Sequence, residues 1–105
     1  MTGDRVADGA VLTHWIAVAL GEHTHLVGLL LCGHPLLAPG RWMITSPVVA
    51  YDKSSQIAVT ASAGRPYHLL EPLEGAVPKE IFDLIEQVAR LWKIPPGTTI
   101  AETDL

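Results

Sequence analysis

Residues 22–34 (EHTHLVGLLLCGH) hold three of the five histidines of the chain and its only cysteine. Imidazole nitrogens and thiolates are the ligands that zinc prefers, and a cysteine beside a histidine can act as a nucleophile with its base. No other segment of the sequence offers comparable chemistry. The segment therefore offers two candidate sites, a metal site and a catalytic pair.

The alternation of side chains along a strand separates the members of this cluster. If residues 23–33 form a strand, His23 and His25 lie on one face and Cys32 lies on the other. An extended chain from His25 to Cys32 also spans roughly 23 Å, whereas zinc holds its ligands within about 2.3 Å. The sequence predicts no metal and no other cofactor within one chain, so a metal would have to be shared between two chains. His23 and His25 are interpreted as the solvated turn end of a strand, and Cys32 as a small buried hydrophobic residue.

Cys32 and His34 do not form a convincing catalytic pair. Two residues apart on a strand, their side chains would lie roughly 6.5 to 7 Å from each other. No Asp or Glu follows His34 before Asp52 to orient the imidazole. The G-x-S-x-G, P-loop, dinucleotide-binding and H-E-x-x-H patterns are also absent. We therefore expect no enzyme, and a loop in which His34 and Pro35 shape the turn.

Two arginines stand next to aromatic residues and form the candidate partner-binding set. Arg41 precedes Trp42, and Arg65 stands two residues before Tyr67. On adjacent strands these four residues could form an arginine and aromatic patch, and such residues are enriched where proteins bind each other. In the alternative interpretation Trp42 and Tyr67 pack in the core and the arginines solvate the strand ends.

The elements that would position these side chains can be read from the apolar pattern. Five β-rich runs separated by turn signals predict strands at residues 11–20, 23–33, 41–52, 56–63 and 67–73. Gly21-Glu22 predicts a type II′ hairpin turn between the first two runs. One apolar helix broken at Gly21 remains the alternative for this region. Pro47 must interrupt the third run with an edge, a bend or a bulge.

The period then changes to that of a helix. Pro78 suits a first helical turn, the apolar residues from Ile81 to Trp92 form one broad stripe, and Pro95-Pro96-Gly97 ends the helix. The predicted fold is α+β, an antiparallel five-stranded sheet or small barrel with one C-terminal amphipathic helix. Trp15 and Trp92 are expected to face each other in the core, between the hairpin and this helix.

Length and composition predict one domain with an apolar surface. The 105 residues form a single domain, 1–105, with mobile ends at about 1–9 and 98–105. Hydrophobic residues make up 49% of the chain and charged residues only 17%. A domain of this size exposes much of itself, so we expect part of the apolar surface to be covered by another protein or by a second copy in a homo-oligomer.

The charge pattern narrows the classes of partner. Seven basic and eleven acidic residues give a net charge of −4 without any basic run, which makes nucleic-acid binding unlikely. The apolar runs are shorter than a membrane span, so no membrane partner is expected. The N-terminal residues lack the order of a signal peptide, and the expected compartment is the cytoplasm.

Two segments resemble short, uncharacterised proteins encoded by phages and prophages. The shared features are a Gly-His-Pro loop leading into a Thr-Ser strand, then a second strand ending near a Gly-x-x-Tyr-x-Leu piece. The matching residues here are Gly33, His34, Pro35, Gly40, Thr45, Ser46, Gly64, Tyr67 and Leu69. The resemblance covers less than half of the chain and does not reach the helix. It implies a phage accessory role without an assigned activity.

The functional expectation is a non-enzymatic accessory protein that acts by binding another protein. The excess of apolar residues without catalytic ones favours this class, and the resemblance suggests an inhibitor of a host enzyme or of a defence complex. The alternatives are a nucleic-acid-binding small barrel, which the charge disfavours, and a small-ligand or metal-binding module that uses the histidines.

Overall fold

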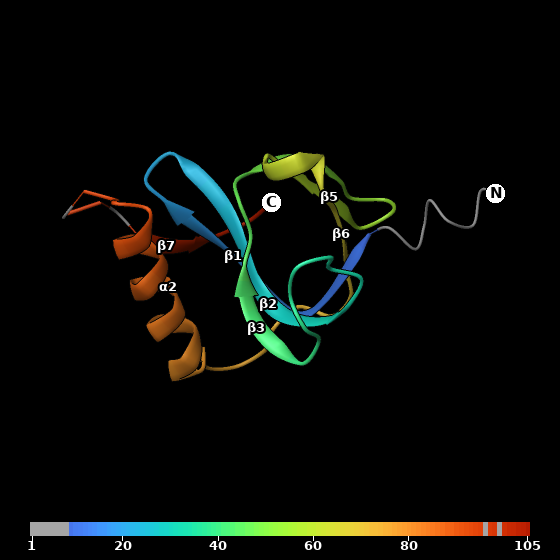
Figure 1. The fold of residues 1–105 in the computed structure, drawn as a ribbon, viewed down its shortest axis with the longest axis horizontal. Coiled ribbons are helices and arrows are strands. Elements are labelled where there is room, and N and C mark those ends of the chain that lie inside the picture. The colour runs from blue at the N-terminus through green and yellow to red at the C-terminus, as the bar shows by residue number, and fades with distance from the viewer. Residues whose placement is uncertain (1–8, 96, 99) are drawn as a thin grey trace.

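The fold is α+β, with one helix and a mostly antiparallel sheet (Figure 1). The computed structural model describes residues 9–95, 97–98 and 100–105. The elements in chain order are β1 (Ala10–Leu20), β2 (His23–Cys32), β3 (Arg41–Ile44), β4 (Val48–Asp52), β5 (Ile57–Thr60), the 3-10 turn η1 (Ser62–Gly64), β6 (Pro66–Leu69), α2 (Lys79–Leu91) and β7 (Ile100–Thr103). The strand order is β3-β2-β1-β6-β5-β4, and β7 also pairs with β1. Among the strand pairs of the described residues, β1 with β6 is the one parallel pair, and an isolated parallel bridge joins Trp15 to Pro72.

The predicted α+β class and the C-terminal helix are confirmed, but the five-stranded sheet is wrong. In the described part of the chain the sheet has seven strands and is open rather than a closed barrel. One additional strand arises because the run 41–52 is divided at Ser46-Pro47 into β3 and β4. Strand β3 pairs with β2, while β4 pairs with β5 at the other end of the strand order. Pro47 therefore marks the place where the chain crosses from one end of the curved sheet to the other.

The second additional strand lies in the segment expected to be mobile. Ile100–Thr103 forms β7, whose residues pair with Ala17–Leu20 of β1. No strand was evident in the sequence there because all four residues of β7 are exposed and show no buried face. The expected mobile start of the chain, up to about Gly9, lies outside the described residues except for Gly9 itself, which is buried.

The β1–β2 hairpin is confirmed, and the helical alternative for residues 11–20 is wrong. Leu20 pairs with His23 across the two-residue turn, in which Gly21 has a φ of +66°. A positive φ at the first central residue is the feature that a type II′ turn requires, and glycine adopts it without steric cost.

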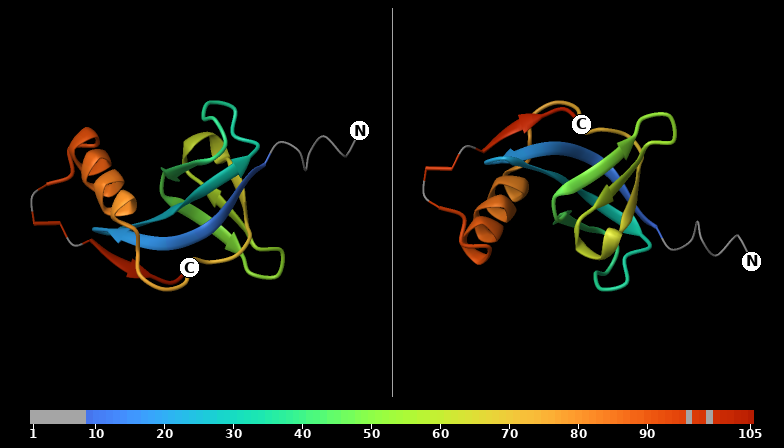
Figure 2. Two further views of the ribbon diagram at one scale, coloured as in Figure 1. Left: turned by 90° about the horizontal axis from the view of Figure 1, so that it is seen from below. Right: turned by 90° about the horizontal axis from the view of Figure 1, so that it is seen from above.

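A bulge in β1 allows this strand to pair with different partners along its length. The β1–β2 register shifts between Thr13 and Ile16, and His14 has a φ of +49°. Gly28 lies opposite the bulge, where an added Cβ would come within 3.0 Å of the Trp15 side chain. Before the bulge β1 pairs with β6, and after it β1 pairs with β7. Figure 2 shows the resulting curvature of the two long strands.

The core is divided between the two faces of this curved sheet. One cluster lies inside the curve and contains Ala10, Leu12, Ala17, Leu26, Leu30, Met43, Ala58, Tyr67 and Leu69. The second lies under the helix and contains Ile16, Val18, Leu20, Val27, Ile81 and Ile85. Because β1 and β2 are covered on both faces, their sequences are apolar almost throughout rather than alternating.

Helix α2 begins at Lys79, one residue after the predicted start at Pro78, and covers one end of the sheet (Figure 1). Ile81 and Ile85 are its buried residues, and burying each side chain contributes about 1.5 to 3 kcal/mol. The apolar stripe is buried only in part, since Leu91 is 76% exposed and Trp92 is 41% exposed. No helix in the described part of the chain is long and apolar enough to cross a membrane.

Candidate functional site

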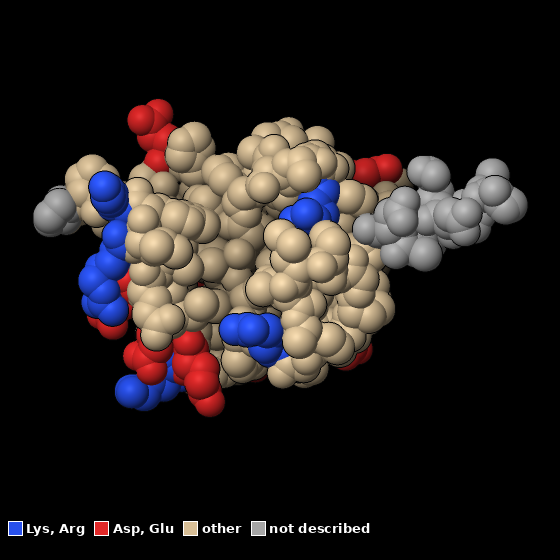
Figure 3. Space-filling model, viewed as in Figure 1, with Lys and Arg blue, Asp and Glu red and all other residues tan. Residues whose placement is uncertain are grey.

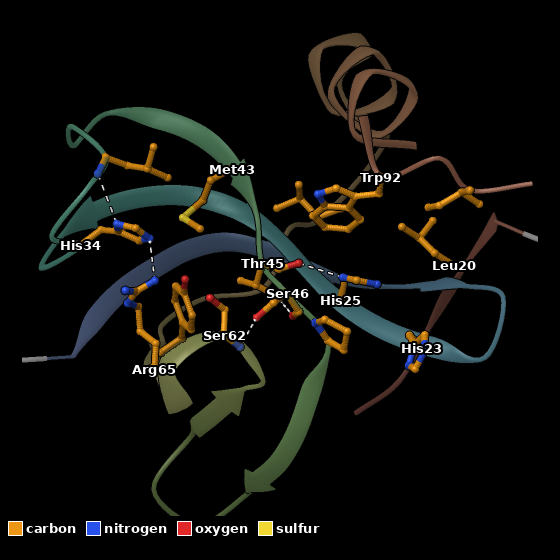
Figure 4. Close-up of a pocket in the computed structure, with 15 residues that line it drawn as sticks. Leu20, His23, His25, His34, Met43, Thr45, Ser46, Ser62, Arg65 and Trp92 are labelled. Atoms are coloured by element: carbon orange, nitrogen blue, oxygen red, sulfur yellow. Dashed lines mark hydrogen bonds between the residues drawn. The ribbon is translucent and has the colours of Figure 1, made fainter. Parts of the chain in front are cut away.

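An open pocket of about 580 Å³ lies around the connection between β3 and β4 (Figure 4). Its lining comes from five regions: the β1–β2 hairpin, the loop that follows β2, β3 with the β3–β4 connection, the η1–β6 segment, and the residues just after α2. In Figure 4, His34 and Arg65 lie at one end and His25 and Trp92 at the other, with Thr45 and Ser46 between them. We call this the central pocket.

The first end of the central pocket is formed by His34 and Arg65, with Tyr67 beside them. Nδ1 of His34 accepts hydrogen bonds from the backbone N–H groups of Leu36 (3.0 Å) and Leu37 (3.2 Å). Nη1 of Arg65 lies 3.3 Å from Nε2 of His34. The Tyr67 ring packs 6.4 Å from the imidazole, centroid to centroid. The predicted role of His34 in shaping its turn is confirmed by these two backbone hydrogen bonds.

The electrostatics of this end favour a neutral histidine beside a charged arginine. Burial lowers the pKa of His34, and the positive charge of Arg65 lowers it further. Burial raises the pKa of Tyr67, while a hydrogen bond with Arg65 and its charge partly oppose this rise. Both rings are therefore uncharged near neutral pH, and Arg65 carries the only permanent charge among the described residues that line the pocket.

The other end of the central pocket is built on His25. Its Nδ1 donates a hydrogen bond of 2.8 Å to the carbonyl oxygen of Thr45. Its ring packs on the indole of Trp92, with centroids 5.1 Å apart and planes at 32°. Burial lowers the pKa of His25, the hydrogen bond to Thr45 raises it in part, and nearby His23 lowers it again.

One prediction about the histidines and one about the tryptophans are therefore wrong. His25 is buried, with 3% of its surface exposed, whereas the sequence placed it at a solvated strand end. His23 is exposed, as expected. Trp92 packs on His25 at the pocket, and Trp15 instead donates its indole N–H to the carbonyl oxygen of Leu70. The two tryptophans thus have separate partners.

Cys32 is exposed rather than buried among apolar residues. It lies at the last position of β2, beyond the region where both faces of the sheet are covered. It does not line the central pocket, whereas His23, His25 and His34 do. Among the described residues, no three side chains of His, Cys, Asp or Glu are grouped so as to hold a metal ion.

The structure separates the predicted patch of arginines and aromatics into two places. Arg65 and Tyr67 line the central pocket together. Arg41 and Trp42 lie on β3 near the polar side of α2, where they line a smaller hollow with Glu80 and Asp83. The pairs are separated because β3 and β6 are not neighbours in the sheet. Tyr67 is buried in the core, and Trp42 packs in part against the core under the helix.

A second groove, of about 430 Å³, runs between α2 and β7, and we call it the α2–β7 groove. Ile16 and Val18 of β1 line it from the sheet. The helix contributes Phe82, Ile85 and Glu86, and the last strand contributes Ile100, Ala101 and Glu102. Phe82 is 57% exposed and Ile100 is 48% exposed, so large apolar side chains face solvent here.

No protein-family model, no curated protein and no solved structure matches this chain. Its candidate sites therefore have to be judged on their own geometry.

Sequence reasoning missed the contributions of Thr45, Ser46, Ser62 and Trp92 to the central pocket. His25 and Trp92 are far apart in the sequence, and no local pattern predicts that their rings stack. One signal was present, because four of the residues that carry the phage-type resemblance line this pocket: His34, Thr45, Ser46 and Tyr67.

Proposed function

We propose that the protein is a non-enzymatic binding protein that recognises a segment of another protein in the α2–β7 groove. The observation that supports this most is the exposure of Phe82 and Ile100 beside a groove lined from below by Ile16 and Val18. Exposed apolar clusters of this kind mark interaction surfaces more often than ordinary surface. The aromatic side chain of Phe82 can supply an anchor, since aromatic residues are enriched at interfaces.

The charge around the groove indicates the chemistry of the partner. Glu86 and Glu102 line the groove, and no Lys or Arg is among its described lining residues. A partner segment that combines apolar side chains with Lys or Arg would bury the former and pair the latter with these carboxylates.

The backbone of β7 indicates the form of the partner segment. Among the described residues, β7 pairs only with β1, so its outer edge has backbone groups free to pair. An extended segment can add to such an edge while its alternate side chains enter the adjacent groove.

The test is affinity capture from the native host, compared between the wild-type protein and two variants. In Phe82→Glu a charge replaces the apolar side chain at the groove. In Leu91→Glu the same charge is introduced on the same helix, at an exposed residue that does not line the groove. We expect the wild-type protein and Leu91→Glu to retain the partner. Phe82→Glu should bind it at least about tenfold more weakly.

Thermal unfolding of both variants controls for loss of structure. If Phe82→Glu retains the partner as well as the wild-type protein does, the groove is excluded as the binding site. Binding should also weaken as salt is added, because the pairing of Glu86 and Glu102 with basic residues is screened. The inhibitor role suggested by the phage-type resemblance is a further proposal. It requires that the captured partner is an enzyme or defence complex whose activity falls on binding.

A further inference from the structure

The hydrogen bonds of His34 determine which of its ring nitrogens carries the proton. Nδ1 accepts from two backbone N–H groups, those of Leu36 and Leu37, so it bears no hydrogen. A neutral imidazole has one N–H, which must then be at Nε2. Protonation of Nδ1 would place a hydrogen against both backbone donors. Burial and the charge of Arg65 also lower the pKa of His34 and so favour the neutral ring.

This tautomer leaves two donors facing each other in the central pocket. Nη1 of Arg65 lies 3.3 Å from Nε2 of His34, and a guanidinium has no acceptor. With the proton at Nε2, neither group can accept from the other. The hydroxyl of Tyr67, whose ring packs beside His34 and whose pKa Arg65 partly lowers, is a third potential donor. Three donors therefore converge on a place where the described residues supply no charged acceptor.

Among the described residues that line the central pocket there is no Asp or Glu. The charge of Arg65 is thus not neutralised there by any described side chain. An anionic oxygen placed between Arg65 and His34 would accept from both and neutralise the guanidinium. One arginine with neutral donors matches a single negative charge, and a carboxylate is the common planar monoanion that an arginine binds through two hydrogen bonds.

The remainder of the pocket is mostly apolar, with His23 and His25 at its far end, and it is larger than a carboxylate needs. Beyond Thr45 and Ser46 lie Leu20 and Trp92 (Figure 4). Pro47 and Ile94 also line the pocket. The Trp92 ring is 41% exposed and is supported from one side by His25. Such a surface favours an apolar or aromatic group attached to the anion.

We propose that the central pocket binds an apolar, preferably aromatic, monocarboxylic acid, with its carboxylate between Arg65 and His34 and its apolar group against Trp92. The carboxylate can belong to a small molecule or to the C-terminal residue of a peptide. This site is separate from the α2–β7 groove, and ligand binding in the central pocket does not depend on whether a partner binds in the groove.

The experiment uses calorimetry and amide NMR spectra with matched probes. The small-molecule probes are 3-phenylpropionate and its uncharged amide, with acetate as the anion that lacks an apolar group. The peptide probes are acetyl-Gly-Gly-Phe with a free C-terminal carboxylate and the same peptide as its C-terminal amide. We expect at least one of the two aromatic carboxylates to bind in the millimolar range or tighter, and each amide and acetate to bind about tenfold more weakly. Which carboxylate binds more tightly identifies the source of the ligand.

Three variants assign the binding to its residues. Arg65→Gln keeps polar hydrogens but removes the charge, and we expect it to weaken carboxylate binding about tenfold or more. Arg41→Gln, which makes the same charge change outside the pocket, should bind within about twofold of the wild-type protein. Trp92→Ala should weaken binding of the aromatic acids and not of acetate.

The amide spectra show whether each variant is folded, so a loss of binding can be separated from a loss of structure. The proposal is overturned if neither aromatic acid binds at millimolar concentration, or if the amides bind as well as the acids. It is also overturned if folded Arg65→Gln binds the acids as tightly as Arg41→Gln does.

Discussion

His25 and His34 are both fixed by a backbone group through Nδ1, yet they present opposite chemistry to the central pocket. Nδ1 of His25 donates to the carbonyl oxygen of Thr45, which makes the Nε2 of the neutral ring an acceptor. Nδ1 of His34 accepts from backbone N–H groups, which makes its Nε2 a donor. A ligand that spans the pocket would meet donors near Arg65 and an aromatic platform with an acceptor near Trp92.

The buried His25 should make the stability of the protein depend on pH. Its pKa in the folded protein is lowered, mainly by burial, so below about pH 6.5 the unfolded chain binds more protons than the native state. The contribution of His25 to the free energy of unfolding is complete above that pH and is lost as the pH falls toward the pKa of His25 in the folded protein. We expect His25→Gln to reduce the slope of unfolding free energy against pH between about pH 7 and 5.5, where one proton contributes at most about 1.4 kcal/mol per pH unit.

The measurement is urea unfolding at several pH values in this range. His34 also has a lowered pKa, so some slope should remain in His25→Gln. His14→Asn is the control, because His14 is exposed and has a positive φ that asparagine tolerates. An unchanged slope in His25→Gln would show that burial of this ring does not control its protonation.

Among the elements, the connection between β3 and β4 depends on the side chain of Thr45. Strand β3 ends at Ile44, yet Thr45 continues its pairing with β2, because its N–H donates to the carbonyl oxygen of Leu26 at 2.8 Å. Oγ1 of Thr45 then accepts from the N–H of Leu26 at 3.0 Å. A side-chain oxygen thus replaces a backbone acceptor where the chain turns toward Pro47. The same turn places the Thr45 carbonyl oxygen against His25.

Replacing Thr45 by valine should therefore destabilise the fold more than replacing it by serine. Valine keeps the shape of the side chain but leaves the buried N–H of Leu26 without an acceptor, which costs about 1 to 3 kcal/mol. Serine keeps the oxygen and loses one methyl group, at about 0.8 kcal/mol. The free energies of unfolding in urea provide the comparison. Equal stability of Thr45→Val and Thr45→Ser would mean that the Leu26 N–H finds another acceptor.

The elements that the sequence predicted well are those whose pattern reflects local geometry. Helix α2 follows from Pro78 and the apolar period that includes Ile81 and Ile85, and the β1–β2 hairpin follows from Gly21. Strand β7 could not be predicted, because its residues are exposed and its order comes from pairing with β1, far away in the sequence. The crossing at Pro47 was expected as an interruption, but the change of pairing partner depends on the whole sheet.

The candidate site likewise has features that follow from nearby residues in the sequence and features that depend on distant contacts. The role of His34 in its turn was predictable, because its partners are only two and three residues away. The burial of His25 was not, since it results from a helix end that brings Trp92 over the ring. Arg65 and Tyr67 were selected for their residue types, and their meeting with His34 required the pairing of β1 with β6.

The whole molecule combines exposed apolar side chains with a net negative charge. The exposed large hydrophobic residues include Leu36, Val49, Phe82, Leu91 and Ile100. On the face in Figure 3, charged side chains gather mainly along the helix, and the centre carries only two separate basic patches. This arrangement favours contact with apolar protein surfaces and offers no continuous basic surface on that face for nucleic acid.

The expected homo-oligomer can be tested by changing the salt concentration, because apolar contact and net charge have opposite effects on association. Apolar contact favours association of two copies, whereas the net charge of −4 on each copy opposes it. Salt shortens the Debye length from about 30 Å at 0.01 M to about 10 Å at 0.1 M, so the repulsion weakens while the apolar attraction remains. We expect sedimentation equilibrium to give a mean mass above the 11.3 kDa of one chain, and a higher mass at the higher salt concentration.

The variant Phe82→Glu shows which surface is responsible. If two copies associate through the α2–β7 groove, this variant should stay at the mass of one chain at both salt concentrations, because it adds a negative charge to a groove that already contains Glu86 and Glu102. If the variant associates like the wild-type protein, the copies meet through another apolar surface, such as that around Val49 on the edge strand β4. A wild-type protein that remains a monomer at both salt concentrations would exclude self-association and leave the exposed apolar residues to a different protein.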